Sequence, residues 1–255
     1  MEKHFYLKIR IALGLMSVLM FSSCQTDEFS ETAGLNMEPE LTEEAEASDP
    51  TLRVNNQVLF PVTAKLFGKC NEDWAIHLAK ATAALNCENV NDAQLLKLTD
   101  KVVAPYGNVE DASASYTITK DQFVFLSPAF IFNYYGCPAE YEWEPAEGQS
   151  IEDFLKEFAK ETMDGIKTLD VFFDGIQIVE INEYRLNTDL FYFTANPDLS
   201  ECYEPCFTGK PQPGLVDGYF LMFKKMKKGK HTILIKGEVP SVDFTFQINI
   251  NLNVI

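Results

Sequence analysis

Residues 243–255 read DFTFQININLNVI, and their pattern is the clearest indication of the fold class. Phe, Ile, Leu and Val occupy every second position from 244 to 254, and the positions between them carry Thr, Gln and Asn. Successive side chains of a β-strand point to opposite faces, so the alternation predicts a long strand with one apolar and one polar face. Such a strand is typical of an antiparallel sheet that covers a core on one side and meets water on the other.

Several earlier segments also predict strands separated by turns. The run 122–133 is dense in Phe, Val and Ile, and the runs 169–173 and 176–181 flank Asp174-Gly175, a strong signal for a two-residue hairpin loop. The runs 219–226 and 231–236 flank a lysine-rich turn, whereas 184–194 alternates less cleanly. We therefore expect a mainly β, α+β fold, built as an antiparallel β-sandwich.

Two segments predict helices that pack against this sandwich. Asn71 is placed to cap a first helix that has Glu72 and Asp73 in its first turn, where acidic residues suit the helix dipole. Ser150 is placed to cap a second helix, whose apolar residues between 151 and 166 fall on one face.

The amino terminus predicts export and a lipid anchor. Residues 1–23 have the cationic start, the apolar run from Ile11 to Phe21 and the small residues before Cys24 that make a signal peptide. The apolar run is too short to span a bilayer as a helix, which needs about 20 residues. A cysteine at this place resembles a bacterial lipobox, which implies that Cys24 is lipidated and ties the chain to the membrane. The alternative is ordinary secretory cleavage nearby, with Cys24 uninvolved.

The segment 24–53 predicts an acidic, disordered tether, followed by a single domain over 54–255. The tether is rich in Asp and Glu and poor in apolar residues, so it cannot bury enough surface to fold. Gln25-Thr26-Asp27-Glu28 resembles the export signal of Bacteroidota-type surface lipoproteins, which implies display on the outer membrane. The net charge of −17 argues against a nucleic-acid partner, because acidic side chains repel phosphates. The net charge by itself also gives no attraction to anionic lipid headgroups.

The cysteines after Cys24 are in a compartment that permits disulfides. Cys202 and Cys206 bracket a short loop and could close it with a disulfide. Cys70 and Cys87 flank the first predicted helix, too far apart to pair with each other, and one of them could pair with Cys137. No zinc site is expected, because the sequence lacks Cys-x-x-Cys pairs and has few histidines. Calcium is the more plausible metal for the loops Asn187–Asp189 and Asn196–Asp198, but neither matches the Asp-x-Asp-x-Asp pattern, so we expect no metal and no cofactor.

Asp217-Gly218-Tyr219, followed by Lys227–Ile233 (KKGKHTI) and Gly237, resembles the C-terminal signature of a family of uncharacterised secreted or lipid-anchored bacterial proteins. Upstream, Asp174-Gly175 followed by Tyr184-Arg185 is similar to a second short motif of that family. The resemblance implies a fold rather than an activity, because the family has no assigned chemistry.

The segment 134–144, YYGCPAEYEWE, is the strongest candidate for a ligand site. Aromatic rings stack on sugars and carboxylates accept hydrogen bonds from hydroxyls, so the candidate glycan-binding residues are Tyr134, Tyr135, Tyr141 and Trp143. The simpler interpretation is a strand with Tyr141 and Trp143 on the core side and the glutamates in water. The same glutamates could in principle form a hydrolase acid–base pair.

The remaining polar residues offer weaker candidates. His231 follows the lysine-rich turn, where a structural role competes with that of a general base, and His77 lies near an apolar helix stripe. The lysines between 224 and 230 could dock an acidic partner or lipid phosphate, or could simply be solvated.

The sequence has no recognisable nucleophile or metal motif. We therefore expect a lipid-anchored binding or structural module on the cell surface or facing the periplasm, with a glycan or protein ligand, rather than an enzyme. The alternative is a secreted hydrolase with a carboxylate site that carries no recognisable motif.

Overall fold

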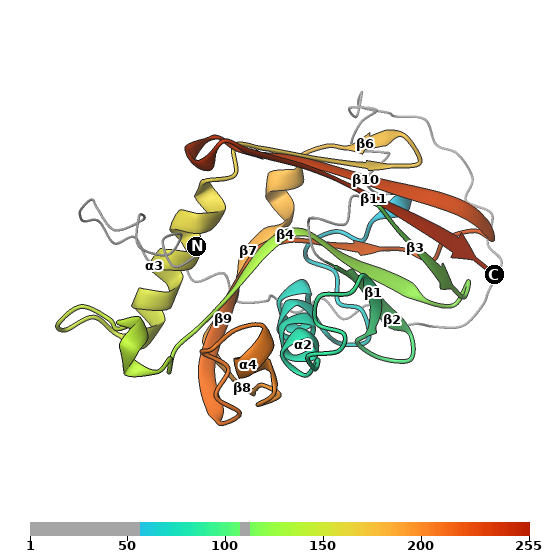
Figure 1. Cartoon of the computed structure of the whole chain (residues 1–255). Helices are drawn as coiled ribbons and strands as arrows, with labels where there is room; N and C mark the ends of the chain where they lie inside the picture. Colours follow the sequence, from blue (N-terminus) through green and yellow to red (C-terminus); the bar gives the residue numbers. More distant parts are fainter. Residues whose placement is uncertain (1–56, 108–112) are drawn as a thin grey trace.

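The computed structural model describes residues 57–107 and 113–255, so the predicted signal peptide over 1–23, Cys24 and the predicted tether over 24–53 lie outside the described residues. The described chain forms two facing β-sheets with helices packed against one of them (Figure 1). The prediction of a mainly β, sandwich-like α+β fold is confirmed.

The first sheet has six strands in the order β1-β2-β4-β9-β7, and β8 also pairs with β9. Its strands are β1 (Gln94–Lys97), β2 (Val102–Tyr106), β4 (Phe123–Tyr134), β7 (Arg185–Asn187), β8 (Phe191–Thr194) and β9 (Pro211–Phe223). From Gly214 onward β9 is buried at every position, because both of its faces are covered. A strand covered in this way is a continuous apolar run and does not alternate.

The second sheet has five strands in the order β3-β11-β10-β5-β6. Its strands are β3 (Ser113–Ile118), β5 (Thr168–Phe173), β6 (Ile176–Ile178), β10 (Gly229–Val239) and β11 (Phe244–Val254). Asp174 and Gly175 form the hairpin turn between β5 and β6, and both have positive φ angles, of 49° and 80°. This hairpin and the long alternating strand β11 agree with the sequence prediction.

Not all strand pairs are antiparallel, contrary to the prediction. β2 runs parallel to β4, and β3 runs parallel to β11. The physical reason is that the chain crosses between the two sheets at β3 and returns with β4. Alternation shows which face of a strand is buried, but it does not show the direction of its neighbour.

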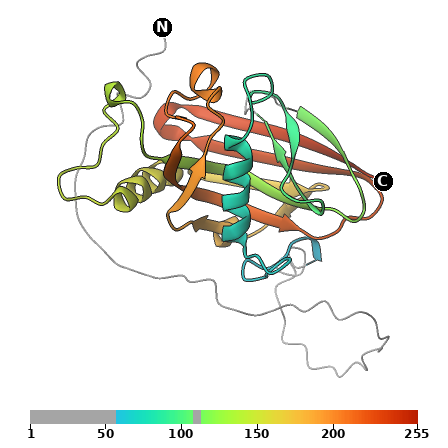
Figure 2. The same ribbon diagram turned by 90° about the horizontal axis from the view of Figure 1, so that it is seen from below.

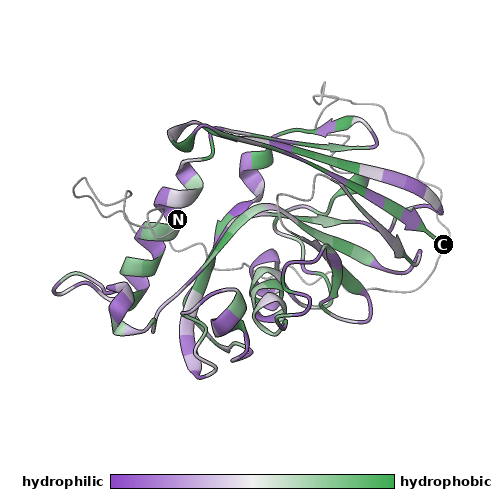
Figure 3. Ribbon diagram, viewed as in Figure 1, coloured by the Kyte–Doolittle hydropathy of each residue, from purple (hydrophilic) through white to green (hydrophobic). Residues whose placement is uncertain are grey.

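Two apolar layers hold the sheets and helices together. One lies between the sheets and joins side chains of β4 and β9, such as Leu126 and Leu221, to those of β10 and β11, such as Ile233 and Leu252. The other lies on the opposite face of the six-stranded sheet, where Phe125 and Phe220 stack with ring centroids 5.6 Å apart. Figure 3 shows the apolar stretches of β4 and β9 between these layers.

The helix α2 (Asn71–Ala83) crosses the outer face of the six-stranded sheet (Figure 2). The cap differs from the prediction, since Cys70 is the N-cap residue and its backbone N–H donates to the Asp73 carboxylate (2.9 Å). Asn71 is instead the first helical residue, and its side-chain amide donates to the Phe220 carbonyl (3.3 Å).

The helix α3 (Ile151–Asp164) packs against β4 and β9 near one end of the sandwich. Ser150 caps it as predicted, since its hydroxyl oxygen accepts a hydrogen bond from the Asp153 N–H (3.0 Å). The buried amide of Asn133 donates to the Leu155 carbonyl (2.8 Å) and so fixes α3 on β4.

Among the described residues there is also a third helix, α4 (Leu199–Cys202), and there are three short 3-10 helices. These are η1 (Ala139–Tyr141), η2 (Ile181–Tyr184) and η3 (Pro240–Val242). In this part of the chain no helix is long and apolar enough to cross a membrane.

The prediction of a disulfide between Cys202 and Cys206 is wrong, because each of these residues pairs with a different cysteine. Both residues form disulfides, but Cys202 bonds to Cys87 and Cys206 bonds to Cys137. The reason is that Cys202 ends α4 beside the loop that follows α2, whereas Cys206 lies beside the loop that follows β4. Each bond therefore joins loops that are far apart in sequence, with separations of 115 and 69 residues.

Candidate functional site

The aromatic segment 134–144 does not continue as a strand. β4 ends at Tyr134, Gly136 takes a positive φ of 106°, and the chain then turns through η1. Cys137 is tied to Cys206 in this turn. The prediction of an alternating strand with Tyr141 on its core side is therefore wrong, and Tyr141 is 49% exposed.

The four predicted ring residues do not share one face. Tyr134 packs with Phe193 and Phe207 on the side of α2, with ring centroids 5.7 and 4.7 Å away. Tyr135 and Trp143 belong to a different cluster, on the side of α3. Because the rings divide between two clusters, the segment does not form one flat aromatic platform.

Trp143 is half-buried and has a structural environment. Its ring packs against Phe154 and Phe158 of α3, with centroids 4.5 and 4.7 Å away, and its indole N–H donates to the Tyr134 carbonyl (2.8 Å). The Tyr135 hydroxyl donates to the Glu144 carboxylate, and this hydrogen bond raises the pKa of Tyr135. The ring contacts of Trp143 attach the segment to α3, and the two hydrogen bonds join residues within the segment.

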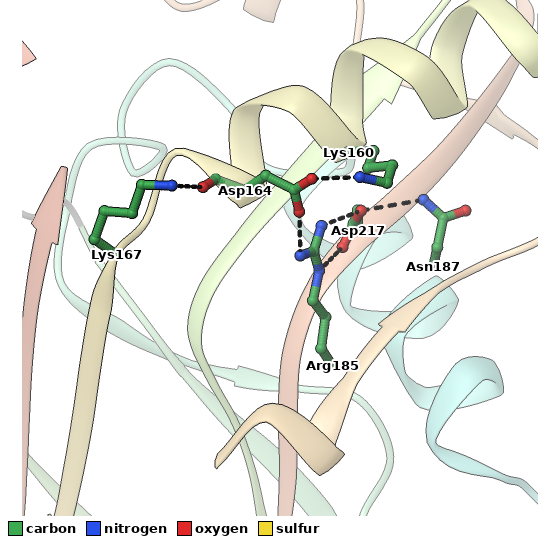
Figure 4. A network of polar contacts seen from close by, with 6 residues as sticks. All are labelled: Lys160, Asp164, Lys167, Arg185, Asn187 and Asp217. Carbon is green, nitrogen blue, oxygen red and sulfur yellow. Dashed lines mark hydrogen bonds and ion pairs between the residues drawn. The ribbon is translucent and has the colours of Figure 1, made fainter. Parts of the chain in front are cut away.

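An ion-pair network joins α3 to the six-stranded sheet (Figure 4). Asp217 of β9 is only 2% exposed, and its carboxylate accepts hydrogen bonds from Nε and Nη2 of Arg185, both at 3.0 Å. Arg185 also pairs with Asp164 at the end of α3, which in turn pairs with Lys160. Register explains the geometry, because Arg185 pairs with Tyr219 and Asn187 with Asp217 across β7 and β9.

This network acts as a clamp, by which we mean that its ion pairs hold α3 against the six-stranded sheet, and it does not act as an acid–base pair. Burial tends to raise the pKa of Asp164, but hydrogen bonds from Lys160 and Arg185 outweigh it and hold that pKa below its ordinary value. A general acid at neutral pH needs a raised carboxyl pKa. The Tyr184-Arg185 and Asp217-Gly218-Tyr219 motifs therefore meet in a structural contact.

His231 also has a structural environment. Its Nδ1 lies 2.7 Å from the Asp174 carboxylate and its Nε2 lies 2.9 Å from the Lys227 carbonyl, so both ring nitrogens have partners. Burial lowers the pKa of His231, but Asp174 and the Lys227 carbonyl outweigh it and hold that pKa above 6.5. The contact fastens the β5–β6 hairpin to the turn before β10. His77 packs beside Trp74, with ring centroids 5.5 Å apart.

The best candidate for ligand contact is an open hollow along β8, which we call the Tyr192 hollow. It has a volume of about 270 Å³ and is lined by Lys80, Tyr192, Phe193, Thr194 and Pro211. Tyr192 is 65% exposed. Among the large apolar and aromatic side chains in the described part of the chain, none is more exposed.

Local structure explains why this ring is exposed. Along β8 the side chains alternate, so Phe191 and Phe193 enter the core while Tyr192 and Thr194 face water. Gly214 of β9 lies opposite Phe191, and a Cβ at Gly214 would meet Phe132 at 2.8 Å, so only glycine lets these rings pack there.

Lys80 of α2 brings a cation to the same hollow. Its ammonium lies 5.5 Å from the centroid of the Phe191 ring. The Tyr192 hollow therefore combines an exposed ring, an ammonium donor and the Thr194 hydroxyl. The alternation of Phe191–Thr194 was the signal for this site, but the uneven pattern of 184–194 as a whole obscured it.

Within the described residues, no group of three or more His, Cys, Asp or Glu side chains could hold a metal ion. The glutamates of the 134–144 segment are exposed, and Glu144 is bonded to Tyr135.

No family model matches the chain, and no curated protein matches it. Two solved structures show similarity. The cysteine protease inhibitor EhICP2 from Entamoeba histolytica is 9% identical, with a TM-score of 0.23, over 61% of this chain and 95% of that one. The solution structure of Amebosin is 13% identical, with a TM-score of 0.21, over 62% of this chain and 99% of that one. Scores this low carry no argument about this chain.

Proposed function

We propose that this chain is a lipid-anchored binding module that is displayed from the outer membrane and takes a glycan as its ligand. The observation that carries the proposal is the Tyr192 hollow, where a highly exposed ring lies beside an ammonium and a hydroxyl. A sugar ring can stack on the face of Tyr192 while its hydroxyls bond to Lys80 and Thr194. Aromatic side chains of this kind dominate binding energies, because they offer a large, rigid contact area.

The hollow is open and shallow, which suits binding at the surface of an extended polymer. Enzyme sites usually enclose most of a small substrate in a deeper pocket with converging polar groups. In the described residues, the most buried carboxylate, that of Asp217, is fully engaged by Arg185 and Asn187. These features favour a binding module over the hydrolase alternative.

A glycan array tests the ligand class. The chain from residue 25 onward, which contains every described residue, should bind at least one class of glycan. Tyr192→Ala should lower that signal at least tenfold, because truncating a central aromatic contact costs about 2 kcal/mol or more. Tyr141→Ala is the matched control, since this tyrosine is also exposed but lies outside the hollow.

Two results would overturn the glycan proposal. One is the absence of any array signal from the unchanged chain, and the other is equal binding by the Tyr192→Ala and Tyr141→Ala variants. Because Tyr192 is exposed, its replacement should change the unfolding free energy by less than about 0.5 kcal/mol.

The anchor is tested separately at Cys24. We expect the mature protein to carry the mass of an acylated Cys24 and to partition into detergent. Cys24→Ala should remove the acyl mass and shift the protein to the aqueous phase. Unchanged partitioning of that variant would contradict the proposed anchor.

A further inference from the structure

Lysines gather at one end of the sandwich, where strand ends of both sheets meet. β9 ends at Phe223 beside Val124 near the start of β4, and β10 begins at Gly229 beside Val254 at the end of β11. This end lies beside the C-terminus in Figure 1. We call its basic residues the lysine end: Lys97, Lys101, Lys120, Lys224, Lys225, Lys227, Lys228 and Lys230.

The charge of the domain is therefore strongly segregated. The described residues include 17 Lys and Arg and 26 Asp and Glu, and eight of these basic residues belong to the lysine end. The turns that carry them hold two acidic residues, Asp100 and Asp121, and Asp174 of the β5–β6 turn lies beside them. Asp100 pairs with Lys97, and Asp174 pairs with His231. Net charge alone predicts repulsion from anionic lipids, but this end of the domain is positive.

An exposed aromatic ring lies beside these lysines. Phe67 is 53% exposed, and its ring meets Phe123 edge-on, with centroids 5.7 Å apart. The ammonium of Lys225 lies 5.3 Å from the centroid of the same Phe123 ring. Lysines that reach phosphates around an apolar ring that enters the lipid boundary are typical of interfacial membrane binding.

Phe67 keeps this position at a cost in backbone strain. It has a positive φ of 54°, in the left-handed region that residues with a Cβ rarely adopt. Strained residues are often found at binding surfaces, where the strain is part of how a side chain is presented.

The chain enters the domain at the same end. The Lys224 N–H donates to the Val58 carbonyl, and the Phe60 N–H donates to the Met222 carbonyl, both at 2.9 Å. The segment that leads back to Cys24 therefore joins the domain beside the lysine end. A membrane that holds Cys24 is close to this surface at high effective concentration.

We propose that the lysine end binds the phosphate-bearing headgroups of an anionic membrane surface. This contact turns the domain so that the lysine end faces the lipid. The Tyr192 hollow lies at the other end of β9, where β8 pairs with Pro211–Gly214 (Figure 1). A strand rises about 3.3 Å per residue, so the path along the curved strand β9 (Figure 1) from the hollow to the lipid-facing end is roughly 40 Å. The ligand site is then directed away from the membrane.

Vesicle flotation of the chain from residue 25 onward tests the surface without an acyl group. We expect flotation with vesicles of equal parts phosphatidylglycerol and phosphatidylcholine at ~0.1 M salt, where the Debye length is about 10 Å. Flotation should fall at least tenfold with phosphatidylcholine alone, and again at ~1 M salt, where that length is about 3 Å.

Charge-matched variants locate the contact. The triple variant Lys120→Gln, Lys227→Gln, Lys228→Gln should lower the apparent affinity for anionic vesicles at least tenfold. The control variant replaces three exposed lysines outside the lysine end by glutamine: Lys160, Lys167 and Lys210. It should bind anionic vesicles with the same affinity as the unchanged chain. Phe67→Asn should also weaken flotation while leaving the fold intact, because asparagine tolerates a positive φ.

Three outcomes would overturn this proposal. They are equal affinity of the two triple variants, equal flotation with neutral and anionic vesicles, and no flotation with either. Binding to soluble heparin without flotation would assign the lysine end to an acidic polymer instead. Because no glycan array enters this test, its failure leaves the proposal for the Tyr192 hollow unaffected.

Discussion

Removing Arg185 should reveal how strongly the clamp between α3 and the six-stranded sheet holds the fold. The replacement Arg185→Met keeps most of the aliphatic stem and removes the guanidinium from Asp217. That carboxylate is 2% exposed and would keep only the Asn187 amide, which lies 3.3 Å away. Leaving a buried charge without its ionic partner costs about 3–5 kcal/mol.

The loss is large compared with the stability of an ordinary domain, which is about 5–15 kcal/mol. For a domain of about 200 residues, each kcal/mol shifts Tm by about 2–4 °C, so Tm should fall by roughly 6–20 °C. Urea unfolding with the disulfides intact, followed by circular dichroism, measures the free energy directly. The slope with denaturant should stay unchanged if only stability is altered.

Two companion variants separate the buried pair from the surface pair. Lys160→Met breaks the exposed pair with Asp164 and should cost less than about 1 kcal/mol. Arg185→Met combined with Asp217→Leu removes both buried charges and should recover at least half of the loss. A cost below about 1 kcal/mol for Arg185→Met alone, or a double variant no more stable than the single one, would show that the buried pair does not stabilise the fold as expected.

Three further predictions concern the disulfides, His231 and Trp143. Peptide mapping without reduction should recover Cys87 joined to Cys202, and a bond from Cys202 to its neighbour Cys206 would contradict the structure. Because the pKa of His231 is raised in the folded state, protonated His231 stabilises the fold fully at pH values below 6.5, the ordinary pKa of histidine, and this contribution is lost as the pH rises through the raised pKa. Asp174→Asn should make the free energy of unfolding less dependent on pH, as measured by urea titrations at several pH values. Trp143→Ala should cost about 2 kcal/mol in thermal unfolding, below the range for a fully buried aromatic ring, and should leave glycan binding unchanged.

The sequence predicted those parts of the fold that local patterns specify. The alternation in β11, the Asp174-Gly175 turn and the Ser150 cap depend on neighbouring residues, and all three agree with the structure. The parallel pairs and the disulfide pairings depend on how distant segments meet, and no local pattern encodes that. The same limit applies to Asp217, which looks like a surface acid in sequence and becomes buried because α3 and β7 cover it.

The sequence drew attention to a different segment from the one that holds the proposed site. Aromatic residues were expected to be the ligand contacts, and the segment 134–144 has the densest cluster of them. Tyr134, Tyr135 and Trp143 are packed into the clusters on the sides of α2 and α3, and Tyr141 is less exposed than Tyr192, which lies in a less conspicuous strand. Which ring reaches solvent is decided by the helices that cover each strand, and the sequence does not show where these helices pack.

Calorimetric titration of the best array glycan into the unchanged chain and two variants at position 192 tests whether a sugar stacks on Tyr192. Stacking on Tyr192 needs the ring and not the hydroxyl, so Tyr192→Phe should bind within about threefold of the unchanged chain. Tyr192→Ala should bind at least tenfold more weakly, which corresponds to a loss of about 1.4 kcal/mol or more. If Tyr192→Ala binds as well as the unchanged chain, or Tyr192→Phe binds as weakly as Tyr192→Ala, the ring of Tyr192 is not the stacking surface for the glycan.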